Sequence, residues 1–258
     1  MPKRTHQRRS KKEARKVEIL TRLNQLQGIF SNQAANTVKQ IEAYVGIQHY
    51  LATGQLLPDF HGWPVCPDFG LYLIKLIETQ PYDLVIEFGS GSSSWLIANV
   101  RKRKSFQHLA FDHLEQYWSQ TKNKLEADGL LNHIHLILAP LVPCMGLDGV
   151  NYSYYDCSSA LAEFAADFNH AGKRLLVVID GPPAGTGPHA RYPALQHVLA
   201  QYPLADIDFL LDDLIREDEQ EILQMWQKHL SDLKVSYKSH ILRMEKDAAL
   251  LSVTRQGP

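Results

Sequence analysis

Few cysteines and no long apolar run occur in this sequence, and each absence excludes a class of protein. The three cysteines among 258 residues, Cys66, Cys144 and Cys157, are widely spaced. This fits neither a zinc motif nor a disulfide framework and favours free thiols. No run of about 18 apolar residues is present, so we expect no transmembrane helix. The basic N-terminus lacks the apolar stretch of a secretory signal, and we therefore expect a cytoplasmic protein.

The formal net charge of −1 conceals an uneven distribution along the chain. Residues 1–16 contain eight Lys and Arg and a single Glu. Subtracting these from the totals of 27 basic and 28 acidic residues leaves 19 basic and 27 acidic residues, a charge of −8 for the remainder. We predict a disordered basic tail over residues 1–17, with binding of nucleic acid or an anionic membrane by this tail as the alternative.

Apolar residues spaced three or four positions apart follow the basic tail and predict a long helix, within an N-terminal helical extension over residues 18–62. They are Ile19, Leu23, Leu26, Phe30, Ala34, Val38, Ile41 and Val45. We expect a break in the helix near Gly28 or Ser31. The apolar stripe is expected to pack on the rest of the protein, with a homodimer through this helix as the alternative.

The remainder of the chain alternates between apolar runs and helical stretches, a pattern typical of a doubly wound α/β domain. The expected strands are 84–88, 106–111, 134–138, 175–179 and 207–211. Because these runs are nearly continuous, both faces of each strand should be buried, as in a parallel sheet. Two further strands, 234–239 and 248–254, are joined by too short a loop for a crossover and should form an antiparallel hairpin. The sequence therefore predicts a seven-stranded, mostly parallel sheet.

The stretch "DLVIEFGSGSSSW", residues 83–95, places a loop of glycines and serines directly after a strand. A P-loop needs a lysine at its end, and the next lysine is Lys102, which disfavours an NTPase. A dinucleotide fold has a third glycine where Ser94 stands. The loop thus predicts a bound ligand other than a nucleotide phosphate.

Two carboxylates beside this loop narrow the choice of ligand. Glu87 ends the first strand, and Asp112 ends the second, where an acid commonly bonds ribose hydroxyls. A carboxylate at the loop repels pyrophosphate but attracts an ammonium group or hydroxyls. We therefore expect a ligand with a ribose, a positive charge and no phosphate, and S-adenosyl-L-methionine meets this description.

Seven segments then follow one another in order along the chain. They are "GWPVCPDF", "VIEFGSGSSSWLIA", "FDHLEQYW", "APLVP", "SYYD", "LLVVIDGPPAGTGPHARYPAL" and "LLDDLIREDEQEILQMW". Together, over residues 63–254, they resemble class I, Rossmann-like S-adenosylmethionine-dependent methyltransferases. More narrowly, they are similar to a bacterial group of small methyltransferases associated with sugar and glycosyl-transfer pathways. The family usually has a third glycine where this chain has Ser93. The resemblance implies a methyltransferase domain over residues 63–258.

The resemblance also implies a role for each matching residue. The implied cofactor-binding residues are Glu87, Gly89, Ser90, Gly91, Asp112, His113, Pro140 and Leu141, with Ala139 beside the last two. Asp180, at the end of the fourth strand, would face the methyl group and the acceptor. The cofactor implied is S-adenosyl-L-methionine.

An alcohol or phenol acceptor also needs a base to remove its proton. Asp180 and His189 are the candidate catalytic residues. Arg191 is a candidate for binding an anionic acceptor, and Tyr154 and Tyr155 for stacking on a sugar or aromatic ring. We therefore expect O-methylation of a small-molecule or sugar-containing acceptor.

A divalent metal is a variant of this mechanism. Asp180, Asp212 and Asp213 resemble the acids of metal-dependent O-methyltransferases, in which Mg²⁺ holds a deprotonated diol. Arg216 follows closely, however, and Asp213 has a helix cap or an ion pair with this arginine as an alternative role. No metal is assigned on this basis.

Three other functions stay open at this point. The basic tail would guide an RNA methyltransferase to its substrate, although the acidic remainder of the chain counts against this. A non-catalytic scaffold protein would keep the fold and recruit a partner through the long helix. An NAD-dependent oxidoreductase is disfavoured by Ser94 and by the carboxylate of Glu87.

Overall fold

The computed structural model gives a fold to nearly the whole chain. The described residues are 3–52, 54, 56–60, 64–168 and 171–255. Gly62 and Trp63 of the "GWPVCPDF" segment lie outside them, so the structure says nothing of these two residues.

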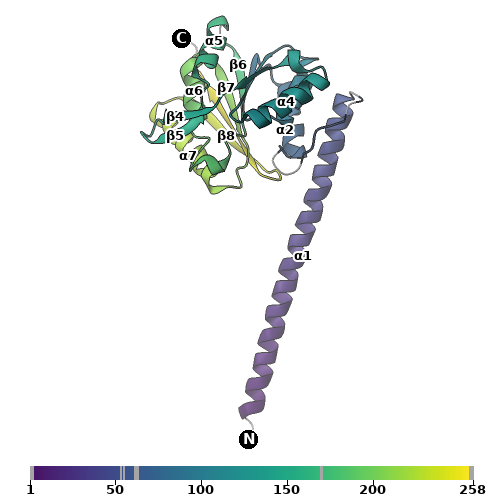
Figure 1. Ribbon diagram of the computed structural model, residues 1–258. Helices are drawn as coiled ribbons and strands as arrows, with labels where there is room; N and C mark the ends of the chain where they lie inside the picture. The colour runs from purple at the N-terminus through teal and green to yellow at the C-terminus, as the bar shows by residue number, and fades with distance from the viewer. Residues whose placement is uncertain (1–2, 53, 55, 61–63, 169–170, 256–258) are drawn as a thin grey trace.

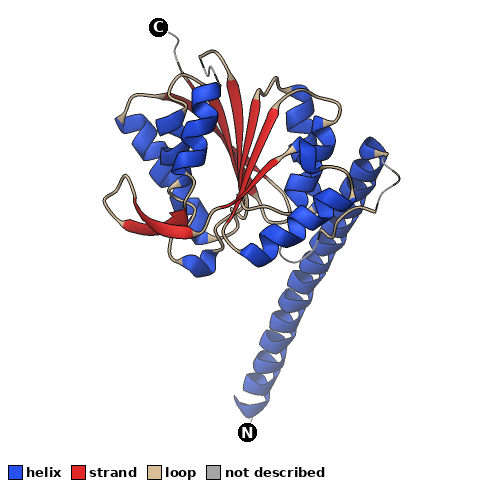
Figure 2. Ribbon diagram, turned by 45° about the horizontal axis from the view of Figure 1, so that its top comes forward, coloured by secondary structure: helices blue, strands red, loops and turns tan. Residues whose placement is uncertain are grey.

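A single seven-stranded sheet forms the centre of the body (Figure 2). Its strand order is β3-β2-β1-β6-β7-β9-β8. The strands are β1 (Leu84–Phe88), β2 (Gln107–Asp112), β3 (His135–Leu138), β6 (Arg174–Ile179), β7 (Asp206–Leu211), β8 (Ser236–Leu242) and β9 (Ala248–Thr254). The first five are parallel, whereas β9 runs antiparallel to both β7 and β8. The predicted seven-stranded, mostly parallel sheet with a C-terminal hairpin is confirmed.

Helices cover both faces of this sheet, as Figure 2 shows. They are α2 (Pro67–Thr79), α3 (Ser92–Arg101), α4 (Glu115–Ala127), α5 (Ser158–Asp167), α6 (Ala194–Gln201) and α7 (Glu217–Asp232), with short 3₁₀ turns at η1 (Leu131–His133) and η2 (Ala184–Thr186). One apolar layer is built around Trp95 of α3 and Phe69 of α2, and the other around Trp226 of α7 and Leu195 of α6. Two buried layers explain why the strands read as continuous apolar runs.

A small hairpin outside the main sheet was not expected from the sequence. Strands β4 (Leu141–Met145) and β5 (Asn151–Tyr155) pair antiparallel. The turn between them is built on Asp148, whose carboxylate accepts hydrogen bonds from the Val150 amide at 3.1 Å and the Tyr152 hydroxyl at 2.7 Å. The sequence contains a signal for this hairpin, because Asp148 and Gly149 form an Asp-Gly pair.

Helix α1 (Lys3–Leu51) is continuous and projects from the body (Figure 1). The expected break near Gly28 or Ser31 does not occur, so that expectation is wrong. The helix also includes residues 3–17 of the segment predicted as a disordered tail, which is rich in the good helix formers Lys and Arg. The three-part division at residues 17 and 62 stays a prediction. Among the described residues, no helix is long and apolar enough to cross a membrane.

The apolar stripe of α1 does not pack on the body over most of its length, contrary to our first expectation. Phe30 is 67% exposed and Leu23 is 54% exposed. The end of the helix is different, because Ala43, Ile47 and Leu51 are buried there, next to α2. Periodicity identified the apolar face of the helix but carried no information on what covers it.

Candidate functional site

The loop of glycines and serines connects β1 to α3 and has a fixed backbone geometry. Gly89 has a φ of +101°, and its amide donates to the Phe111 carbonyl at 3.0 Å. A Cβ at this position would lie 3.0 Å from the backbone carbonyl carbon of Asp180. Because both the positive φ and the close backbone approach exclude a side chain, glycine is required where the ends of β1 and β6 meet.

A cavity of about 430 Å³ opens above this loop. Residues 89–93 of the loop, 112–114 after β2 and 180–181 after β6 line it, so it lies at the carboxyl ends of three adjacent strands. This is where open α/β sheets bind ligands. The ring of Tyr155 and the residues Pro64 and Val65 complete its apolar lining. A volume of this size accommodates a small organic ligand.

The electrostatic character of the cavity is acidic. Asp112 and Asp180 contribute carboxylates, and no Lys or Arg is found among the described residues that line it. Burial lowers the pKa of His113 despite the neighbouring Asp112, so this imidazole is neutral at pH 7. A phosphate would meet no positive side chain in this lining, whereas a cationic group or hydroxyls would meet two carboxylates.

Asp112 is held by neutral donors. Its Oδ2 accepts the Ser90 hydroxyl at 2.7 Å, and its Oδ1 accepts the Leu114 amide at 3.1 Å. The Ser90 hydroxyl is also 3.3 Å from the Thr121 Oγ1. The serine that follows the first glycine of the loop thus fixes the orientation of the aspartate on the neighbouring strand.

Glu87 is placed differently from what the sequence suggests. Its side chain is fully buried, and its Oε2 is 2.7 Å from the Nε2 of His108 on β2. It does not line the cavity. The carboxylate therefore joins β1 to β2 beneath the site instead of contacting the space where a ligand sits.

Pro140 and Leu141, assigned to the adenine by the resemblance, do not line the cavity either. The Pro140 carbonyl accepts the amide of Asp156 at 2.9 Å, and Leu141 begins β4 opposite Tyr155. Both residues are used to attach the small hairpin. The adjacent Ala139 is buried, and its amide donates to the Asp112 carbonyl at 2.7 Å.

Asp180 lies between the cavity and a buried arginine. Its Oδ1 accepts Nη2 of Arg191 at 3.2 Å, and the same nitrogen donates to Oδ2 of Asp213 at 2.8 Å. Arg191 Nη1 donates to the Asp212 carbonyl at 3.1 Å. Burial raises the pKa of Asp180 to about 6, against the opposing effect of Arg191. The carboxylate is thus ionised at neutral pH but is a better proton acceptor than an exposed one.

Arg191 is buried, with only 2% of its surface exposed, and it does not line the cavity. Its guanidinium also lies 3.7 Å from Glu219. The expectation that it binds an anionic acceptor does not fit this position, because its donors are directed at Asp180, Asp213 and backbone carbonyls. Its role in the structure is to neutralise a cluster of buried acids.

Asp180, Asp212 and Asp213 present carboxylate oxygens within 4.8 Å of one another, as a metal site requires. Burial raises the pKa of Asp212. One oxygen of Asp180 and one oxygen of Asp213 are paired with the Arg191 guanidinium, and Arg216 Nη1 lies 2.9 Å from the same Asp213 oxygen. Asp212 Oδ2 and Asp213 Oδ1 are buried and accept no hydrogen bond from the described residues. The two arginines thus already supply positive charge to this group of carboxylates, and no metal is assigned to it.

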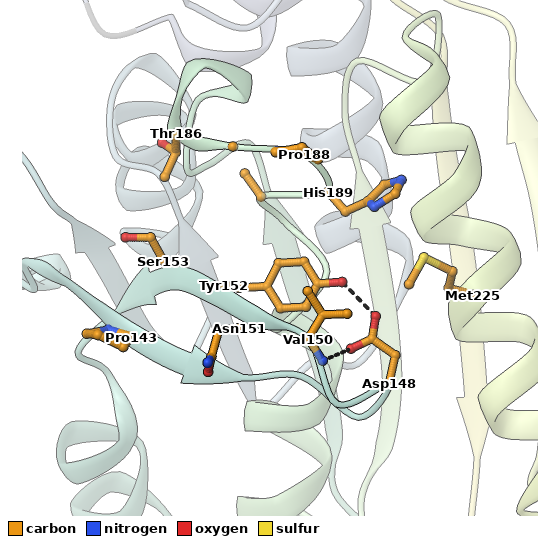
Figure 3. A pocket seen from close by; sticks show the side chains of 12 residues that line it. Pro143, Asp148, Val150, Asn151, Tyr152, Ser153, Thr186, Pro188, His189 and Met225 are labelled. Carbon is orange, nitrogen blue, oxygen red and sulfur yellow. Dashed lines mark hydrogen bonds between the residues drawn. The ribbon is translucent and has the colours of Figure 1, made fainter.

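His189 belongs to a second cavity of about 660 Å³, shown in Figure 3. This cavity lies between the β4–β5 hairpin, residues 186–190 and Met225 of α7. The His189 Nε2 is 2.5 Å from Glu221 Oε2, and its backbone amide donates to Asp218 at 3.2 Å. The two candidate bases, Asp180 and His189, therefore line different cavities.

The two candidate stacking tyrosines also lie in different places. Tyr155 lines the first cavity, with its ring 5.7 Å from that of His113. Tyr154 is completely buried and stacks on His197 at a centroid distance of 5.4 Å. Alternate residues of a strand point to opposite faces, so one tyrosine of the pair reaches a ligand and the other packs in the core.

Sequence reasoning missed one group of residues in the lining. Tyr117, Gln120 and Thr121 of α4 all reach the first cavity. Their spacing of three and four positions places them on one face of the helix that follows Asp112. That spacing was the available signal, because a helix that starts directly after a strand-end acid turns one face towards the same rim.

No protein-family model matches the sequence, and no curated protein matches it. Solved structures do match in fold. An O-methyltransferase from Bacillus cereus in complex with SAH is 14% identical, with 83% of this chain and 91% of that chain covered and a TM-score of 0.52. The O-methyltransferase TomG from Streptomyces achromogenes, in complex with SAM, is 12% identical, with 84% and 89% covered and a TM-score of 0.52. The SAH-bound Podospora anserina methyltransferase PaMTH1 is 10% identical, with 81% and 86% covered and a TM-score of 0.51.

Proposed function

Because the chain has the Rossmann-like fold of class I methyltransferases, we propose that it is an S-adenosyl-L-methionine-dependent methyltransferase that acts on an oxygen of a small-molecule acceptor. The observation that carries this proposal is the acidic cavity at the ends of β1, β2 and β6. A sulfonium, an ammonium group and ribose hydroxyls suit two carboxylates and a glycine loop, whereas a pyrophosphate does not.

Residues from two sides of the cavity would contact the cofactor. Asp112 would accept the ribose hydroxyls, since its carboxylate is oriented by neutral donors at the end of the second strand. The backbone of residues 89–91 would contact the cofactor closely, because the space beside the Cα of Gly91 is open. Tyr155 and Tyr117 supply aromatic surface in the same cavity.

S-adenosyl-L-methionine, when bound, supplies an electrophilic methyl group with its leaving group attached, so no acid catalyst is needed. The protein has to hold the acceptor oxygen in line with the methyl group and remove its proton. Asp180 is the proposed base, because it lines the cavity and its pKa is raised to about 6. Arg191 positions the Asp180 carboxylate through one oxygen and is a positioning residue.

The proposed class of acceptor follows from the assignment of Asp180 as the base. A carboxylate poised for proton removal suits an alcohol or phenol, and a sugar-containing acceptor fits the resemblance to methyltransferases of sugar pathways. The rings of Tyr155 and Tyr117 offer stacking surfaces for such a ring. We propose that no metal takes part, because Arg191 and Arg216 pair with the carboxylates that a metal would need.

The test is calorimetric titration of the full chain with S-adenosylhomocysteine, with NADH in parallel. We expect micromolar affinity for S-adenosylhomocysteine and none for NADH. Asp112→Asn should weaken binding about 10- to 100-fold, as expected for lost hydrogen bonds to a charged group. The matched control is Asp232→Asn, which makes the same change at an exposed position on α7 and should leave the affinity unchanged.

The same titration separates the alternatives. A folded wild-type protein that binds neither ligand would overturn the proposal and favour a scaffold protein. Binding of S-adenosylhomocysteine with methyl transfer to RNA alone, lost on removal of residues 1–16, would support the RNA methyltransferase. Transfer of labelled methyl to a panel of alcohols, phenols and sugars, read by mass spectrometry, then identifies the acceptor. Use of the long helix for a homodimer is treated below.

A further inference from the structure

Helix α1 presents an apolar stripe that the described part of the chain leaves uncovered. About half or more of the surface is exposed for each of its large apolar residues, which are Ile19, Leu20, Leu23, Leu26, Ile29, Phe30, Val38, Ile41 and Val45. Apolar surface of this extent is unfavourable in water and is typical of an interaction site. Figure 1 shows this helix extending well beyond the body.

The exposed part of the helix also lacks the features that stabilise a single helix in solvent. Residues 23–38 contain no Asp, Glu, Lys or Arg, so no ion pair between successive turns supports this stretch. Gly28 lies within it and is a poorer helix former than alanine. A helix of this kind depends on packing of its apolar face, and a partner must supply that packing.

We propose that the partner is a second copy of this chain, with the two α1 helices packed antiparallel. Charge favours this occupant and this direction. Residues 1–16 carry eight basic residues and one acid, whereas residues 17–258 carry a charge of −8. In an antiparallel pair, the basic ends of the two helices lie far apart, each directed towards the body of the other copy. In a parallel pair, the two basic ends would lie together and repel each other.

A groove beside α1 supports the same arrangement. It measures about 570 Å³ and lies between Ile41 and Tyr44 of α1 and the segment around Phe60 of the body. If the pair is centred on the uncharged stretch, near residue 31, residues 37–44 of one copy face residues 18–25 of the other. Ile19 and Leu23 of the partner subunit would then lie at the groove. A two-fold axis makes this contact twice, as an isologous dimer requires.

The first test is the mass of the full chain in solution by light scattering and sedimentation at micromolar concentration. We expect a dimer that the double variant Leu23→Lys/Phe30→Lys converts to a monomer. The matched control, Gln25→Lys/Asn32→Lys, adds the same two charges two residues further on, about 200° around the helix. It should remain dimeric. All four side chains are exposed, so both variants should fold, which circular dichroism checks.

The direction of the helices is tested by a spin label on Glu18→Cys. With 1.5 Å per residue, an antiparallel pair centred near residue 31 places the two labels roughly 39 Å apart, whereas a parallel pair places them within about 15 Å. Cys66 and Cys157 are buried and Cys144 is half-buried, and the parent chain labelled in the same way corrects for them. A monomeric wild type, a dimer that survives the stripe variant, or a short label distance would each overturn the proposal.

Discussion

Asp112 and Asp180 occupy equivalent places in the sheet but have different partners. Each ends a strand that flanks β1, one on β2 and the other just after β6, and both line the same cavity. Asp112 is held by a hydroxyl and an amide, whereas Asp180 is paired with the buried Arg191. The neighbouring carboxylate of Asp213 shares that arginine.

Because of this difference, we propose that Asp112 holds a ligand and that Asp180 reacts with one. Neutral donors orient a carboxylate without cancelling its charge, which suits hydroxyls of a tightly held ligand. A carboxylate in a buried cluster of like charges instead has a raised pKa and accepts a proton more readily. In the proposed function, the two acids therefore define a cofactor side and an acceptor side of one cavity.

The largest expected effect comes from removing the base. Asp180→Asn should lower kcat about 10²- to 10⁴-fold, the usual contribution of a general base. Its affinity for S-adenosylhomocysteine should change little, because Asp112 is intact. Turnover with the identified acceptor and calorimetry together measure this split. Asp232→Asn is the control for turnover, and equal losses of affinity and turnover in Asp180→Asn would contradict the division of roles.

The pattern of the sheet could be predicted from the sequence, because strands buried on both faces leave continuous apolar runs. Asp112 and Asp180 were also predictable, since strand ends can be read from where these runs stop. The partners of the acids could not be predicted. The burial of Glu87 against His108 depends on the register of β1 and β2, and the position of Arg191 depends on contacts between distant segments. The exposure of α1 could not be predicted either, because the spacing of apolar residues does not indicate what packs against them.

A smaller effect is expected from pH. Asp180 acts as a base only when deprotonated, and its pKa is about 6. Turnover should therefore be constant above pH 7 and fall about tenfold per unit below the pKa of Asp180. Arg191 lowers the pKa of Asp180 through its positive charge. Arg191→Lys keeps the charge but loses the contacts that Nη2 makes with both Asp180 and Asp213.

The pH–rate profile of Arg191→Lys should thus shift to higher pH, with affinity for S-adenosylhomocysteine retained. Urea unfolding checks that the variant is folded, since loss of contacts to buried acids also lowers the free energy of unfolding. A profile that is flat from pH 5 to pH 8, or the same in both proteins, would contradict the assignment of Asp180 as the base that Arg191 positions.

The smallest effect is expected from removal of metal ions. The carboxylates of Asp180 and Asp213 are paired with Arg191, and Arg216 adds a second positive charge beside Asp213. A divalent cation would have to compete with a buried guanidinium for these two carboxylates. Treatment with EDTA should therefore change turnover by less than about twofold. A change this small would mean that Lewis-acid catalysis by a metal does not contribute to turnover. A large loss of turnover that Mg²⁺ restores would contradict this prediction. It would show that the arginine cluster rearranges when the acceptor binds, and that a metal takes part on the acceptor side of the cavity.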